Sequence, residues 1–256
     1  MLSVVALILA AGSWTNWYEP LISVRGFRST KTDKWILGAA PILCLILIAA
    51  VLARLSSADV RTDPLEIASY LALGAAWLGA SSLLFPFLGI SARDDVLERS
   101  NHAALWPTIG ALAGITFAFA GANIGNGPGP EAVIFSAALS SVLFFALWFV
   151  MNAIGSSSDS ITIDRDGNSG MRLGAALAGI GLFCGWTVSG NWISFYATVH
   201  DFLLSAWPPV LLAAIATTTE TILQRHPEAS KKLSPFFTVF YLFLPLMWLT
   251  TRGRYV

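Results

Sequence analysis

Long apolar blocks separated by short polar segments run along this sequence of 256 residues. A helix needs about 20 apolar residues to cross the hydrocarbon core of a bilayer. Seven blocks reach that length in whole or nearly so, and they predict transmembrane helices over residues 35–53, 65–90, 104–121, 130–154, 171–188, 202–223 and 235–250. The pattern therefore predicts an all-α integral membrane protein, with a single transmembrane domain over residues 1–256.

A further apolar block, residues 2–18, opens the chain and is short for a span. It could be a secretory signal peptide, but no Lys or Arg precedes its apolar run, and its cleavage site is weak. We interpret the block as a retained first helix, with Trp14, Trp17 and Tyr18 anchoring one end in the membrane interface. The expected bundle has eight helices, or seven if this segment does not span.

Composition supports the membrane interpretation. Hydrophobic residues make up 55% of the chain and charged residues only 12%, whereas soluble domains carry about 25% charged residues. The mean hydropathy is +0.68. An ordinary soluble fold is therefore excluded. The net charge is zero, which gives no reason to expect nucleic acid as a partner.

Basic residues are unequally divided between the two sides of the predicted bundle, which sets its orientation. One side carries Arg25, Arg28, Lys31, Lys34, Arg93, Arg99, Arg165, Arg172, Arg225, Lys231 and Lys232, and the other carries Arg54, Arg61, Arg252 and Arg254. The positive-inside rule places the richer side in the cytoplasm. Both termini then lie outside, and the polar loop 155–170 is cytoplasmic. We expect a bacterial plasma membrane (inner membrane) location.

An internal repeat is predicted in the middle of the chain. Residues 111–115 recur as residues 176–180, and the same offset of 65 gives eleven identities over 45 positions. This predicts two parallel helical hairpins, about 109–153 and 174–218, each turning at the outer face. An axis along the membrane normal would relate them. The alternative is coincidence in a chain rich in Ala, Leu and Gly.

Small residues in the same region predict close helix packing. Gly110 and Gly114 form a G-x-x-x-G pattern, as do Gly181 and Gly185, and Gly179 lies nearby. Such spacing lets helix backbones approach closely where lipid supplies no hydrophobic drive.

Polar residues gather at the predicted outer face, while no Asp, Glu, Lys or Arg lies near the midplane of a predicted span. We select a candidate outer-face polar site of Glu131, His200, Asp201, Asn126 and Asn191. The acids begin helices, so they could bind a cation or proton, or could simply cap their helices. His200 could be pH-sensitive or an ordinary interfacial histidine.

Other patterns give no reactive chemistry. Cys44 and Cys184 fall in separate predicted spans and form no zinc or redox motif. No catalytic triad, pair of catalytic carboxylates or cofactor fingerprint emerges, so we expect no catalytic residue, no cofactor and no metal. The glycine- and proline-rich turn 121–130 could bind an anion through its amides, or could be a plain hairpin connection.

These observations favour a non-enzymatic function within the bilayer. The first hypothesis is a non-catalytic subunit, scaffold or assembly partner of a membrane complex, which contacts other membrane proteins or copies of itself through small-residue helix faces. The alternative is a transporter or channel for a small, uncharged solute. An enzyme acting at the outer surface through His200, Asp201 or Glu131 is the third hypothesis.

Overall fold

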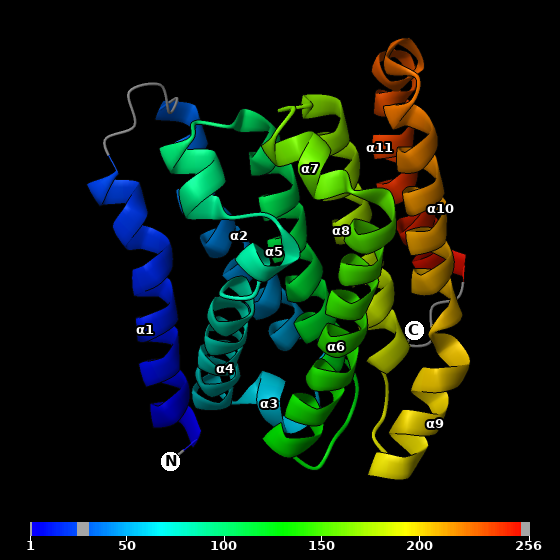
Figure 1. The fold of residues 1–256 in the computed structure, drawn as a ribbon. Coiled ribbons are helices and arrows are strands. Elements are labelled where there is room, and N and C mark those ends of the chain that lie inside the picture. The colour runs from blue at the N-terminus through cyan, green and yellow to red at the C-terminus, as the bar shows by residue number, and fades with distance from the viewer. Residues whose placement is uncertain (1, 25–30, 252–256) are drawn as a thin grey trace.

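The computed structural model describes residues 2–24 and 31–251, and every regular element within those ranges is a helix (Figure 1). The α-helices are α1 (Leu2–Ser23), α2 (Lys31–Leu55), α3 (Ala58–Thr62), α4 (Pro64–Ser82), α5 (His102–Ala122), α6 (Pro130–Gly155), α7 (Ser157–Thr162), α8 (Gly167–Val188), α9 (Phe195–Ser205), α10 (Trp207–Gln224) and α11 (Pro227–Thr251). Between α4 and α5 lie a 3₁₀ turn, η1 (Phe85–Leu88), and a π-helical segment, η2 (Ala92–Glu98).

Six helical segments of the described chain are long and apolar enough to cross a membrane, which is typical of a multi-pass membrane protein. They cover residues 31–55, 102–122, 130–155, 167–188, 195–224 and 227–251. Large apolar side chains on the outside of the bundle are exposed, including Ile8, Trp35 and Phe236, as lipid contact requires. The predicted all-α class is therefore confirmed, as is the presence of several helices long and apolar enough to span a membrane. The count of eight stays a prediction, because α1 and α4 are not among the six.

Side-chain caps explain where several helices begin. Asp63 accepts a hydrogen bond from the Leu65 amide at 2.9 Å, with Pro64 as the first residue of α4. Asn101, Asp166 and Ser194 cap α5, α8 and α9 in the same way. Each cap satisfies an amide that has no partner inside its helix.

Proline and glycine interrupt two of the predicted spans. The apolar block 65–90 is helical only to Ser82, and Gly89 adopts a left-handed φ of 85°. The block 202–223 lies on two helices, because α9 ends at Ser205 and Pro208 and Pro209 open α10. Proline has no amide hydrogen to continue a helix from the preceding turn. The polar segment 155–170 contains the short helix α7.

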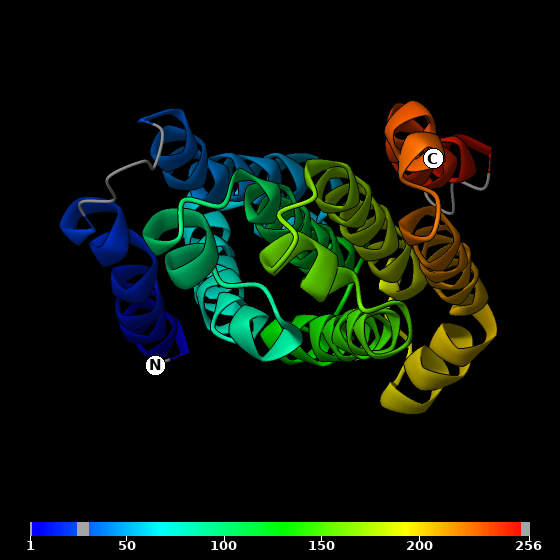
Figure 2. The same cartoon turned by 45° about the horizontal axis from the view of Figure 1, so that its top comes forward.

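Helices α5 and α8 form the centre of the bundle, and they lie side by side (Figures 1 and 2). Most residues of both are buried, whereas most of α11 is exposed. A Cβ atom on Gly110 would meet the backbone of Gly174, and one on Gly121 would meet the backbone of Gly185. The two backbones are thus in direct contact, which only glycine permits.

The structure places the five glycines selected from the sequence at two helix contacts. Gly110, Gly114, Gly181 and Gly185 lie between α5 and α8. Gly179 faces the opposite way, where a Cβ atom would meet the backbone of α11. Helix α8 therefore packs against neighbours on two sides.

The turn after α5, helix α3 and helix α9 lie at one end of the bundle, at the bottom of Figure 1. We call this the outer end, following the prediction from charge. At this end, Gly125 forms an isolated parallel bridge with Ser56, just beyond α2.

Candidate functional site

Two tight turns meet at the outer end and form the floor of the candidate site. The Gly190 amide donates a hydrogen bond to the Ile124 carbonyl at 2.9 Å, and the Gly125 amide donates to the Leu55 carbonyl at 3.1 Å. Gly125 and Gly190 have φ values of 104° and 137°. Both glycines are required, because their left-handed backbone disfavours other residues and a Cβ on Gly125 would lie 2.5 Å from the Gly190 carbonyl carbon.

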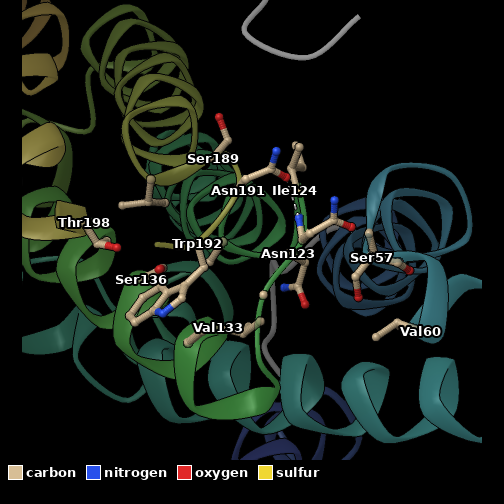
Figure 3. Close-up of a pocket in the computed structure, with 18 of the residues that line it drawn as sticks. Ser57, Val60, Asn123, Ile124, Val133, Ser136, Ser189, Asn191, Trp192 and Thr198 are labelled. Carbon is tan, nitrogen blue, oxygen red and sulfur yellow. Dashed lines mark hydrogen bonds between the residues drawn. The ribbon is translucent and has the colours of Figure 1, made fainter. Parts of the chain in front are cut away.

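A polar cavity of about 90 Å³ lies beside these turns, between the outer ends of several helices (Figure 3). That volume holds several water molecules or a solute of a few heavy atoms. Figure 3 shows Asn123 between Ser57 on one side and Ser136 on the other. Of the described residues that line the cavity, the only one with a charged side chain is Asp201.

Asn123 is a buried amide in the cavity wall. It is only 4% exposed, and its Nδ2 atom donates to the Phe119 carbonyl at 2.8 Å. This bond fixes the orientation of the amide, because a flip would set two oxygens against each other. The Oδ1 atom is buried and accepts no hydrogen bond from any described residue. A buried carbonyl oxygen left without a partner costs about 1–3 kcal/mol, so this atom favours a donor in the cavity.

Two buried hydroxyl-bearing residues complete the polar wall. Ser136 and Tyr70 are 4% and 7% exposed, they line the cavity, and neither hydroxyl has a hydrogen-bond partner in the described parts of the chain. Other hydroxyls are engaged: Thr187 donates to the Cys184 carbonyl at 2.7 Å, and Ser189 donates to the Trp186 carbonyl at 2.9 Å. The cavity thus offers one carbonyl acceptor and two hydroxyls that can donate or accept.

Three of the five residues selected from the sequence line this cavity. Asn191 Oδ1 accepts a hydrogen bond from the Asn126 amide at 2.9 Å, although the residues are 65 positions apart. Asp201 also lines the cavity, with a side chain that is 64% exposed. Glu131 is exposed at the start of α6, and His200 lies 3.4 Å from the Asp201 carboxylate; neither lines the cavity.

Sequence reasoning missed Asn123, Ser136 and Tyr70. Asn123 carried one usable signal, since it is an amide at the end of the apolar run 104–122. Ser136 and Tyr70 carried none, because a serine hydroxyl inside a helix can bond to its own backbone and a tyrosine hydroxyl is common near a membrane surface.

A second polar cluster lies in the opposite half of the bundle. Arg172, which the charge count placed on the cytoplasmic side, is not a solvated surface charge: it lies on α8, is 2% exposed and bonds to Glu220 of α10. The Nε–Oε2 distance is 2.9 Å, and a second bond joins Nη2 to Oε1 at 3.0 Å. Arg172 Nη1 also donates to Ser230 of α11 at 2.9 Å. Because its charge is paired, Arg172 can lie inside the bundle, where it links three helices.

Among the described residues, no three His, Cys, Asp or Glu side chains lie close enough together to hold a metal ion. Comparison with protein families, curated proteins and solved structures gives no match. The fold and the cavity define a helical protein with segments that can span a membrane and a polar cavity at one end.

Proposed function

We propose that this protein is a membrane transporter that binds a small solute in the outer cavity, between two copies of a helical hairpin. The single observation that carries the proposal is the composition of the cavity wall. Its buried acceptor, Asn123 Oδ1, lies among residues supplied in matching positions by both hairpins. Transporters built from repeats bind their solutes at the interface between the repeats.

The matching positions follow the sequence offset of 65. The cavity-lining pairs are Ala122 and Thr187, Asn123 and Val188, Ile124 and Ser189, Gly125 and Gly190, Asn126 and Asn191, Gly127 and Trp192, Val133 and Thr198, and Ser136 and Asp201. The helices after the two turns begin in register as well, α6 at Pro130 and α9 at Phe195. These correspondences support a parallel repeat over about 109–153 and 174–218.

Two matched serines further support the repeat. Ser140 Oγ lies 3.3 Å from the Ala118 carbonyl of α5, and Ser205 Oγ lies 3.4 Å from the Thr187 carbonyl of α8. Each also bonds to the carbonyl four residues earlier in its own helix. In each hairpin the same serine therefore links the second helix to the first.

The proposal includes an orientation and a location. The apolar blocks support eight spans, including α1 and α4, and the charge distribution supports an orientation with both termini outside a bacterial plasma membrane. The cavity would then open to the outside. Toward the other side, α5 and α8 touch through their backbones from Gly121 to Gly110, which closes the path between them. This arrangement supports a carrier that changes conformation rather than an open channel.

Uptake into vesicles tests the proposed function. The full chain is reconstituted in proteoliposomes, and entry of a panel of small solutes, such as urea, glycerol, formamide and methylammonium, is compared with that into protein-free vesicles. We expect saturable entry of at least one solute. Asn123→Ala should reduce it, and the control Val142→Ala, at an exposed position of α6 outside the cavity, should not. Entry at the protein-free rate for the whole panel would contradict transport.

A second candidate function is that of a non-catalytic subunit of a membrane complex. An apolar groove of about 350 Å³ between α2 and α5 supports it, because small residues such as Ala39, Ala40 and Ala113 let a neighbouring transmembrane helix approach closely. The native mass and composition after gentle extraction from the membrane test it. A large assembly with other proteins would support this function, and a particle of this chain alone would contradict it.

A further inference from the structure

We infer that the cavity binds a small ammonium-type cation, either ammonium itself or a small primary amine, through hydrogen bonds to Asn123, Ser136 and Tyr70. The inference rests on the proposed function in taking this cavity as the solute site. It adds the chemistry of the solute. It also differs from the expectation of an uncharged solute, which came from the lack of charges at the midplane of the spans.

The hydrogen-bonding groups favour a ligand that donates. Asn123 Oδ1 can only accept a hydrogen bond, and the Asn123 amide nitrogen already donates to the Phe119 carbonyl. The hydroxyls of Ser136 and Tyr70 can each accept one more hydrogen bond. An ammonium group carries only donors, so it can bond to all three oxygens together. A carboxylate or phosphate would place an acceptor against the Asn123 oxygen and leave that oxygen without a partner.

The charges around the cavity favour a cation over a neutral donor. Asp201 is in the wall. Asp59, Glu66 and Glu131 lie in the first turns of α3, α4 and α6, at the same end of the bundle. A cleft with charges of one sign raises the local concentration of the opposite ion.

Basic residues do not offset the negative charge of these acids around the cavity. Arg54 and Arg61 are the basic residues at the outer end in the described part of the chain, and both are exposed and outside the cavity lining. Asp63 adds a further acid at this end. The net charge near the mouth is therefore negative.

The volume limits the size of the ligand. About 90 Å³ accommodates ammonium or methylammonium together with water, whereas an amino acid or a sugar needs more room. The cavity is polar at the Asn123 side and bounded by Val60 and Val133 elsewhere, as Figure 3 shows. A methyl group on the amine can therefore contact apolar side chains while the nitrogen faces the oxygens.

Binding of radiolabelled methylammonium to the full chain in lipid nanodiscs tests the inference. We expect saturable binding that ammonium chloride displaces, and that urea and sodium chloride at equal concentration do not. Tyr70→Phe and Asn123→Ala should each weaken binding about tenfold, since each removes one hydrogen bond to a charged group. Asp201→Asn should weaken methylammonium binding, because it removes the negative charge from the cavity wall.

The matched control is Val142→Ala, which shortens an exposed side chain of α6 outside the cavity lining and should leave the affinity within about twofold. Thermal unfolding of each variant checks that it folds. Tyr70→Phe removes a single oxygen, so it keeps the test decisive if Asn123→Ala is unstable.

The outcomes separate this inference from the proposed function. Binding of urea as tight as that of methylammonium would overturn the cation preference and leave solute binding standing. Displacement by sodium as effective as by ammonium would overturn recognition through N–H groups. No saturable binding of any probe to the folded wild-type chain would overturn both proposals. Methylammonium binding without uptake into vesicles would support the inference and contradict transport.

Discussion

Replacing Gly110 by alanine tests whether direct backbone contact between α5 and α8 holds the centre of the bundle together. The added Cβ would meet three backbone atoms of Gly174. Backbone atoms cannot rotate away as a side chain can, so the two helices must separate. Gly174, Gly181 and Gly185 on α8 all make close contacts with α5, so a separation at one point loosens the packing at the others.

The size of the effect follows from two opposing contributions. Alanine stabilises a helix by about 1 kcal/mol relative to glycine. Overpacking in a close-packed interior costs about 1–3 kcal/mol and occasionally more. A gap of 0.5–1 Å also removes about a quarter to a half of the dispersion energy of each contact along the interface. We expect a net loss of about 2 kcal/mol in the free energy of unfolding.

Gly12→Ala is the matched control. Gly12 lies within α1, and a Cβ there would meet no atom within 4 Å. This variant should be as stable as the wild type or more stable by up to about 1 kcal/mol. The assay is reversible unfolding in mixed micelles, followed by tryptophan fluorescence. If Gly110→Ala unfolds within about 0.5 kcal/mol of the wild type, or if both variants lose stability equally, the reasoning fails.

Three further predictions concern the buried ion pair, the outer acids and the orientation. Glu220→Ala should destabilise the fold by about 3 kcal/mol, because it leaves the Arg172 charge buried without a partner. The double variant Arg172→Met, Glu220→Leu should regain most of that loss in the same unfolding assay. A double variant as unstable as Glu220→Ala would contradict this. The Ser57 hydroxyl lowers the Asp59 pKa by hydrogen bonding, so Ser57→Ala should raise that pKa in an NMR titration, whereas an unchanged value would refute the bond. The lowered pKa means that this bond stabilises the fold above the unfolded pKa of Asp59, and the contribution disappears as pH falls through the folded value. The orientation can be tested by cysteine labelling in a variant that lacks Cys44 and Cys184. A membrane-impermeant maleimide should label Asp201→Cys on intact cells, and should label Glu228→Cys only after the membrane is permeabilised. The reverse pattern would overturn the proposed orientation.

The spans were predictable because hydropathy is a local property. A helix in lipid must satisfy its backbone hydrogen bonds internally and present apolar side chains, so each apolar block can be recognised without reference to the rest of the chain. The residues at which the helices begin and end were less predictable. Block 65–90 stays apolar beyond Ser82, so hydropathy continues where Pro86 and Gly89 have already ended the helix. The early start of α9 at Phe195 was missed for the opposite reason, since its first turns carry polar residues.

The outer turns were predictable in part. Asn126 and Asn191 were selected because the offset of 65 paired them, and the structure joins them through a hydrogen bond. Asn123 was missed, because nothing local distinguishes an amide that bonds only at its nitrogen from one that is fully satisfied. Its place in a polar cavity wall depends on Ser136 and Tyr70, which lie on other helices.

Local sequence patterns were enough to predict a helical chain apolar enough for a membrane, and to show which side of the bundle carries most of its basic residues. Which polar groups meet depends instead on tertiary packing. The burial of Arg172 could not be predicted, because its partner, Glu220, is 48 positions away and the pair forms only once α8 and α10 have packed. The cavity around Asn123 likewise exists because two glycine turns bring the ends of several helices together. Long-range contacts of this kind depend on how closely backbones can approach, which no single segment specifies.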